Sequence, residues 1–132
     1  MKRYPGLEQP SKPNWEGLVA NILRRGTPDR TYHLELFQDD VKIDAKHGFE
    51  DTIEDVCELK HTLGERIALL GGIDVDFLCR ADEAAIRARG RHTLDVCMPG
   101  GAYCLGTGNS VTNYIPLDNY LAMLDEGWLY GN

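Results

Sequence analysis

Three polar side chains stand just after expected strands of this sequence, and their types suit acid–base chemistry. They are a histidine, a carboxylate and an amide: His47, Asp74 and Asn109. In parallel α/β sheets the carboxyl ends of the strands meet at one edge, and ligands bind there. We therefore predict a catalytic site formed by these three residues, in which His47 pairs with Asp44 or Asp74. The alternative for His47 is a surface or helix-capping role.

A glycine-rich segment follows the last expected strand, running Gly106-Thr-Gly-Asn-Ser110. Successive backbone N–H groups in such a segment can form a nest that accepts an anion. We predict Gly106, Gly108 and Ser110 as ligand-binding positions, with a simple glycine turn as the alternative. No HxxxH or HxC spacing is present, so neither a metal nor a cofactor is predicted. Zinc stays open as an alternative, because ligands from different strands leave no local pattern.

The other titratable candidates have structural interpretations. Asp74 and Asp76 could instead cap the turn that follows them. His33 lies within an expected strand, which favours a core or interface histidine. His61 and His92 lie in expected helices among charged neighbours, and we expect both to be solvated.

The elements that must position these residues alternate between strand and helix. The alternation predicts an α/β fold with a mostly parallel sheet and right-handed crossovers. The expected helices and strands are a helix from Asn14 to a stop at Gly26, strands at 31–37 and 41–45, a helix at 49–63, a strand at 67–70 that is buried on both faces, a helix from Asp82 to Cys97, a strand at 102–105, and a helix from Pro116 that ends at Gly127.

One connection breaks this rhythm. Only residues 38–40 separate the strands at 31–37 and 41–45. Parallel neighbours need a crossover of about a dozen residues or more. These two strands must therefore pair as an antiparallel hairpin or lie in different sheets, one of which could belong to a second subunit.

Length and composition set the outer limits. The 132 residues are enough for one domain, which we place at 14–132. Residues 1–13 are rich in proline, and we expect them to form an extended arm that lies on another surface, such as that of a partner subunit. A net charge of −7 argues against nucleic acid as a partner. No apolar run is long enough to span a membrane, and the N-terminus lacks a signal-peptide pattern, so a cytoplasmic location is expected. The four cysteines have apolar neighbours and are expected to be reduced and structural.

Several segments resemble the uroporphyrinogen decarboxylase superfamily. The C-terminal block, 44–51, 64–76, 100–110 and 115–124, looks like the last three barrel strands of that family with their helices. Residues 18–38 look like its first helix and strand. The family fold is a (βα)8 barrel more than twice as long. The resemblance therefore implies a shortened member, with the middle strands missing and the join near Asp39-Asp40.

The resemblance also bears on activity. Family decarboxylases hold tetrapyrrole carboxylates with arginines just after the first strand, where this chain has Glu35-Leu-Phe-Gln38. The catalytic aspartate of the decarboxylases and the HxC zinc motif of related cobalamin-linked methyltransferases belong to the missing middle, and a further ligand position falls near Asn109. The resemblance thus implies a degenerate, non-catalytic protein that binds a small anionic ligand at the strand carboxyl ends. The alternative is a porphyrin-pathway carboxy-lyase or a methyltransferase that is active only as an assembled oligomer.

A partial barrel has consequences for assembly. About four strands would remain, and their inner faces, at 67–70 and 102–105, would line an open trough. Exposed apolar surface costs roughly 25 cal/mol per Å2, and two copies related by a two-fold axis would cover it. We therefore predict a homodimer in which two half-barrels of the TIM-barrel type complete a closed or nearly closed sheet.

Overall fold

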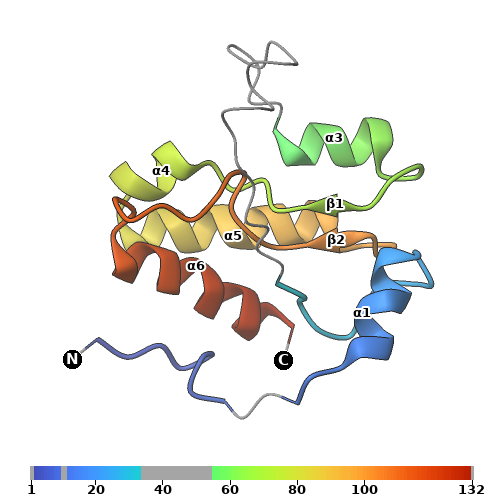
Figure 1. Ribbon diagram of the computed structural model, residues 1–132, viewed down its shortest axis with the longest axis horizontal. Coiled ribbons are helices and arrows are strands. Elements are labelled where there is room, and N and C mark those ends of the chain that lie inside the picture. The colour runs from blue at the N-terminus through green and yellow to red at the C-terminus, as the bar shows by residue number, and fades with distance from the viewer. Residues whose placement is uncertain (1, 10–11, 34–54, 132) are drawn as a thin grey trace.

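The fold mixes helices with a small parallel sheet (Figure 1). The computed structural model describes residues 2–9, 12–33 and 55–131. In chain order the elements are α1 (Trp15–Ile22), α3 (Val56–Leu63), β1 (Leu69–Leu70), α4 (Val75–Arg80), α5 (Glu83–Cys97), β2 (Tyr103–Cys104) and α6 (Leu117–Tyr130). An α/β class with parallel pairing is therefore confirmed. The expected strand at 41–45, the join at 39–40 and the first turns of the expected helix at 49–63 lie outside the described residues.

The sheet is centred on β2. β1 pairs with β2 in parallel, with Leu69 opposite Tyr103 and Leu70 opposite Cys104. Two isolated parallel bridges extend this pairing, one between Ile73 and Thr107 and one between His33 and Leu105. The second bridge places the 31–33 segment on the other edge of β2. The order across the sheet is therefore 31–33, β2, β1.

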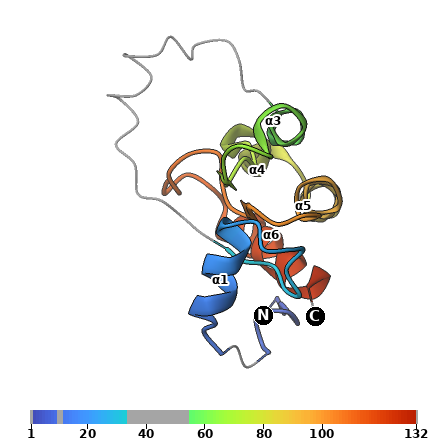
Figure 2. The ribbon, with the colours of Figure 1, turned by 90° about the vertical axis from the view of Figure 1, so that its right-hand side faces the viewer.

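The helices α3, α5 and α6 form a layer against the sheet. α5 contacts both α3 and α6, and α3 contacts β1. Figure 1 shows α5 behind the two strands, and Figure 2 shows α3 and α5 on the side of the molecule away from α1. The core between them includes Leu78, Ile86, Leu94, Leu105 and Met123, each no more than 1% exposed.

The two faces of the sheet differ. Tyr103 interacts electrostatically with Cys57 of α3 and Cys97 of α5, and α3 contacts β1, so Tyr103 and its strand partner Leu69 face the helix layer. Because side chains alternate along a strand, Leu70 and Cys104 point to the opposite face. Cys104 is fully buried, whereas Leu70 is 39% exposed. The prediction of a strand buried on both faces at 67–70 is therefore wrong for Leu70, and Ile67, at 49% exposure, lies outside the core as well.

The helix starts follow local capping signals. Asn14 accepts a hydrogen bond from the Gly17 N–H at the start of α1, and Asp82 accepts one from the Ala85 N–H at the start of α5. Both helices begin where the sequence predicts, and α5 ends at Cys97 as expected. The side chains of α1 are mostly not buried, and Trp15 is 74% exposed.

The last helix is longer than predicted. α6 continues through Gly127 to Tyr130, and Pro116 occupies its N-cap position. Gly127 is buried where α6 crosses the 31–33 segment, and a Cβ there would lie 2.5 Å from His33 Cε1 and 2.6 Å from Leu105 Cδ2. The glycine therefore permits close packing and does not end the helix. The sequence pattern also missed α4, which has only six residues.

Gly127 and Gly90 form a matched pair of buried helical glycines. Gly127→Ala should lower the free energy of unfolding by about 1–3 kcal/mol, because the methyl group has no room beside His33. At Gly90 the nearest atom to an added Cβ is Glu126 Cγ, at 3.7 Å. Gly90→Ala should therefore be neutral or stabilise by up to about 1 kcal/mol through helix propensity. Urea denaturation of both variants checks this, and equal effects would contradict the packing argument.

Candidate functional site

A cleft opens at the carboxyl ends of β1 and β2, the edge at which the sequence places a site. Its volume is about 340 Å3. It lies between α4 and the loop after β2, and its lining residues are Val75, Asp76, Cys79, Asn109, Ser110, Thr112 and Tyr114. The bridge between Ile73 and Thr107 is the last strand pairing before the cleft and holds its two sides together.

Asp74 positions the α4 side of the cleft. One of its carboxylate oxygens accepts the Asp76 N–H at 3.1 Å and the other accepts the Phe77 N–H at 3.2 Å. The carboxylate thus caps α4, where the helix dipole favours a negative charge. This is the capping alternative that the sequence left open for Asp74.

The glycine loop forms the other side. Gly106 O accepts the Ile73 N–H at 3.1 Å, and Gly108 N–H donates to Ile73 O at 2.7 Å. The Ser110 N–H donates to Asn109 Oδ1 at 2.5 Å. Two N–H groups of the expected nest, those of Gly108 and Ser110, therefore bond within the protein. The loop is held as an extension of the sheet, which matches the glycine-turn alternative.

The structure brings together only part of the predicted site. Asn109 and Ser110 line the cleft, whereas Asp74 is the N-cap residue of α4 and is not one of the lining residues. His47 lies outside the described residues. Sequence analysis missed Cys79, Thr112 and Tyr114 as lining residues, because they enter the cleft through the short helix α4 and an irregular loop. The turn after Asp74 was the only local signal for that helix.

The charges of the cleft are nearly balanced. Asp76 Oδ1 lies 2.9 Å from Arg80 Nε on the next turn of α4. Both side chains are more than half exposed, and exposed pairs of this kind contribute little to stability. The rest of the polar lining consists of an amide, two hydroxyl groups and a phenol. Such a lining can recognise a ligand by hydrogen bonds.

The described part of the chain contains neither a candidate metal site nor a helix that could span a membrane. No group of three or more His, Cys, Asp or Glu residues within 2–9, 12–33 and 55–131 could hold a metal ion. Among the same residues, no helix combines the length and the apolar character needed to cross a bilayer.

The thiols are mostly buried, and none forms a disulfide. Burial raises the pKa of Cys97 to about 12 and that of Cys104 to about 11. These thiols therefore stay protonated at neutral pH, in agreement with a structural role. Cys79 is the half-buried exception and lines the cleft.

Comparison of the chain with family models, with curated proteins and with solved structures found no match.

His33 is the most strongly perturbed histidine of the described chain. Its ring packs against the backbone of α6 at Gly127, and burial lowers its pKa from 6.5 to about 4. Neither ring nitrogen has a hydrogen-bond partner among the described residues. The neutral ring is thus a packing element beside Leu105, as expected for a core histidine.

This burial makes stability depend on pH. Between about pH 6.5 and 4, His33 is protonated in the unfolded chain but neutral in the folded chain. The free energy of unfolding is therefore highest above this window and decreases as the pH falls through it. From about pH 7.5 to 4.5 the loss due to His33 should be about 2–3 kcal/mol. Urea denaturation should show a smaller loss for His33→Gln and an unchanged loss for the exposed control His92→Gln. Equal pH dependence in wild type and His33→Gln would contradict the assignment.

Proposed function

We propose that this protein is a shortened, half-barrel relative of the uroporphyrinogen decarboxylase superfamily, without catalytic activity, that assembles as a homodimer. The order of its parallel segments carries the proposal. The resemblance assigns 31–37 to the first barrel strand and 102–105 to the last. Closure of a (βα)8 barrel makes the first and last strands neighbours. The bridge between His33 and Leu105 joins these two segments in parallel.

The layer of helices supports the same proposal. In a TIM barrel the helices surround the sheet on its outside, and the other face of each strand points to the interior. Here α3, α5 and α6 lie together against the face that carries Leu69 and Tyr103. The face that carries Leu70 then corresponds to the barrel interior.

The bonding of the predicted catalytic residues favours a non-catalytic protein. The Asp74 carboxylate caps α4 through both oxygens, and the Asn109 carboxamide oxygen accepts the Ser110 N–H. Both groups are thereby tied into local structure. A small anionic ligand at this edge would meet side-chain donors of the cleft, such as the Asn109 amide and the Tyr114 phenol, in place of a backbone nest.

The second candidate is an enzyme, a decarboxylase or a cobalamin-linked methyltransferase, that works only after assembly. The observation in its favour is the cleft itself, which lies at the strand ends where TIM-barrel enzymes place their active sites. Two copies could bring two such clefts to one rim. The choice between the candidates then depends on turnover by the assembled protein.

Assays of the purified full chain separate the two candidates. We expect no coproporphyrinogen from uroporphyrinogen and no methyl transfer to or from a corrinoid, measured at protein concentrations at which the oligomer is present. A known decarboxylase and a known methyltransferase serve as positive controls. Turnover in either assay that is lost in Asn109→Ala would favour the enzyme candidate and overturn the non-catalytic one.

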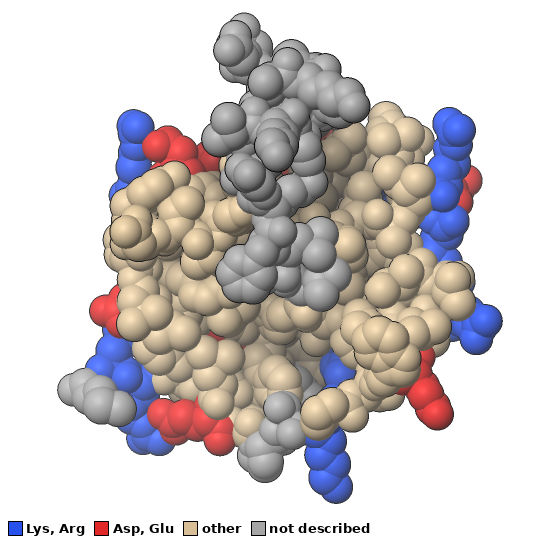
Figure 3. Space-filling model, in the orientation of Figure 1, with Lys and Arg blue, Asp and Glu red and all other residues tan. Residues whose placement is uncertain are grey.

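The open face of the sheet is the surface proposed for dimerisation. In Figure 3, which views the side opposite α5, the described residues that remain visible around the grey atoms are mostly uncharged, and Lys, Arg, Asp and Glu lie toward the rim. Two chains with a net charge of −7 repel each other, and an uncharged face is where this repulsion costs least. Covering apolar atoms such as those of Leu70 adds about 25 cal/mol per Å2.

Leu70 and Leu129 provide a matched test of this interface. They are 39% and 40% exposed, one on the open face of β1 and the other on α6. Sedimentation at low micromolar concentration should show a dimer for wild type and for Leu129→Arg, and a monomer for Leu70→Arg, because a buried unpaired charge is costly. A folded wild-type monomer under these conditions would argue decisively against the dimer, as would a Leu70→Arg variant as dimeric as wild type.

A further inference from the structure

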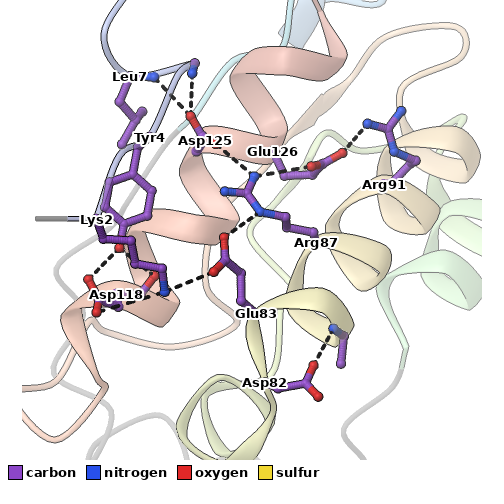
Figure 4. A network of polar contacts seen from close by, with 12 residues as sticks. Lys2, Tyr4, Leu7, Asp82, Glu83, Arg87, Arg91, Asp118, Asp125 and Glu126 are labelled. Carbon is purple, nitrogen blue, oxygen red and sulfur yellow. Dashed lines mark hydrogen bonds and ion pairs between the residues drawn. The ribbon is translucent and has the colours of Figure 1, made fainter.

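The first residues of the chain lie in a charged groove between two helices (Figure 4). From here on, the arm means residues 2–9, the first described part of the expected arm at 1–13. The α5–α6 groove means the surface formed by Glu83 and Arg87 of α5 with Asp118 and Asp125 of α6. Lys2 Nζ lies 3.0 Å from Glu83 Oε2. The Tyr4 hydroxyl donates to Asp118 Oδ1 at 2.5 Å.

Asp125 is the centre of the groove, and its side chain is completely buried. Its Oδ1 accepts two backbone N–H groups of the arm, from Gly6 at 2.5 Å and from Leu7 at 3.2 Å. Its Oδ2 lies 2.8 Å from Arg87 Nη1. A buried carboxylate is costly unless all its oxygens find partners. The helices therefore supply a partner for only one oxygen of the Asp125 carboxylate, Oδ2. The backbone of the arm supplies the partners of the other oxygen, Oδ1.

Contacts that do not involve the arm also join α5 to α6. Arg87 Nε lies 2.9 Å from Glu83 Oε1 within α5, and Arg87 Nη1 also reaches Glu126 Oε2 at 3.4 Å on α6. Arg91 makes a second ion pair with Glu126. These contacts belong to the helices alone.

The fit is closest at Gly6. A Cβ on Gly6 would lie 2.7 Å from Asp125 O, 2.8 Å from Asp125 Oδ1 and 3.0 Å from Trp128 Cβ. Its φ is not positive, so alanine is compatible with the backbone and only the contact with α6 would suffer. The arm thus meets the groove through the side chains of Lys2 and Tyr4 and through the backbone at Gly6.

We propose that the α5–α6 groove is a peptide-binding site that the chain fills with its own arm, and that it also takes the arm of a second copy. A second copy carries the same arm, so every contact can form again between chains, which makes arm exchange a low-cost route to association. The charges agree, because the arm brings Lys2 to the carboxylates of Glu83 and Asp118, while Arg3 pairs with Glu8 within the arm. The groove is separate from the face of Leu70, so this inference does not rest on the proposed function.

The experiment vacates the groove in the full chain. Gly6→Ala should displace the arm, and a fluorescent peptide of residues 1–9 should then bind this variant about tenfold or more tightly than wild type, measured by anisotropy. The matched control, Gln9→Ala, changes an exposed arm residue and should bind the peptide as weakly as wild type. A peptide that itself carries Gly6→Ala should not bind. Failure of the wild-type peptide to bind the folded Gly6→Ala chain would overturn the proposal.

The exchange between chains is tested by competition. Unlabelled wild-type chain should displace the peptide from Gly6→Ala, at higher concentration than free peptide because its own groove competes for the arm. No displacement at millimolar wild-type chain would refute exchange. If Gly6→Ala does not fold, as judged by circular dichroism, the wild-type chain provides the test. Excess unlabelled peptide should then move its Gly6 amide resonance toward that of the free arm, and an unmoved resonance would refute the proposal.

Discussion

A buried central strand must have hydrogen-bond partners along both of its edges, and this requirement organises the structure. Residues 101–107 are all buried. On one edge of β2, Ala102 O and Cys104 O accept the N–H groups of Leu69 and Gly71, at 2.9 Å each. On the other edge, the Leu105 N–H donates to Tyr32 O at 2.9 Å and the Ala102 N–H donates to Asn21 O at 2.6 Å. Because buried backbone groups are rarely left unpaired, α1 and the 31–33 segment are held beside β2.

α6 then links this sheet to the surface through three consecutive buried residues. Gly127 leaves room for His33, and Glu126 forms ion pairs with Arg87 and Arg91 of α5. Asp125 accepts hydrogen bonds from two backbone N–H groups of the arm. One turn of helix thus touches the sheet edge, the neighbouring helix and the N-terminus. A helix that ended at Gly127 would leave this turn at a frayed end, where such buried contacts could not be maintained.

Features encoded by neighbouring residues could be predicted from the sequence, and features that depend on distant contacts could not. Asn14 and Asp82 cap their helices through N–H groups three residues away, so a local pattern was sufficient. Gly127 resembled a helix stop, and only its contact with His33, far away in the chain, explains why it lies inside a helix. The edge of the sheet that holds the cleft followed from the strand order. The roles of Asp74 and of the glycine loop could not be predicted in this way. The local sequence is the same whether an aspartate caps a helix or binds a ligand.

The arm of this chain was expected to lie on another surface, and it packs on its own α6. That position matters for any assembly built on the sheet. A two-fold contact across the open face uses the same patch on both copies and closes after two. An arm given to a copy outside that pair would add a second, head-to-tail contact, which can continue without closing. Filling the groove within the chain limits such growth, since a tethered arm competes at high effective concentration. In the proposed dimer, the Asp125 contact with its own arm would therefore favour closure over an open chain of copies.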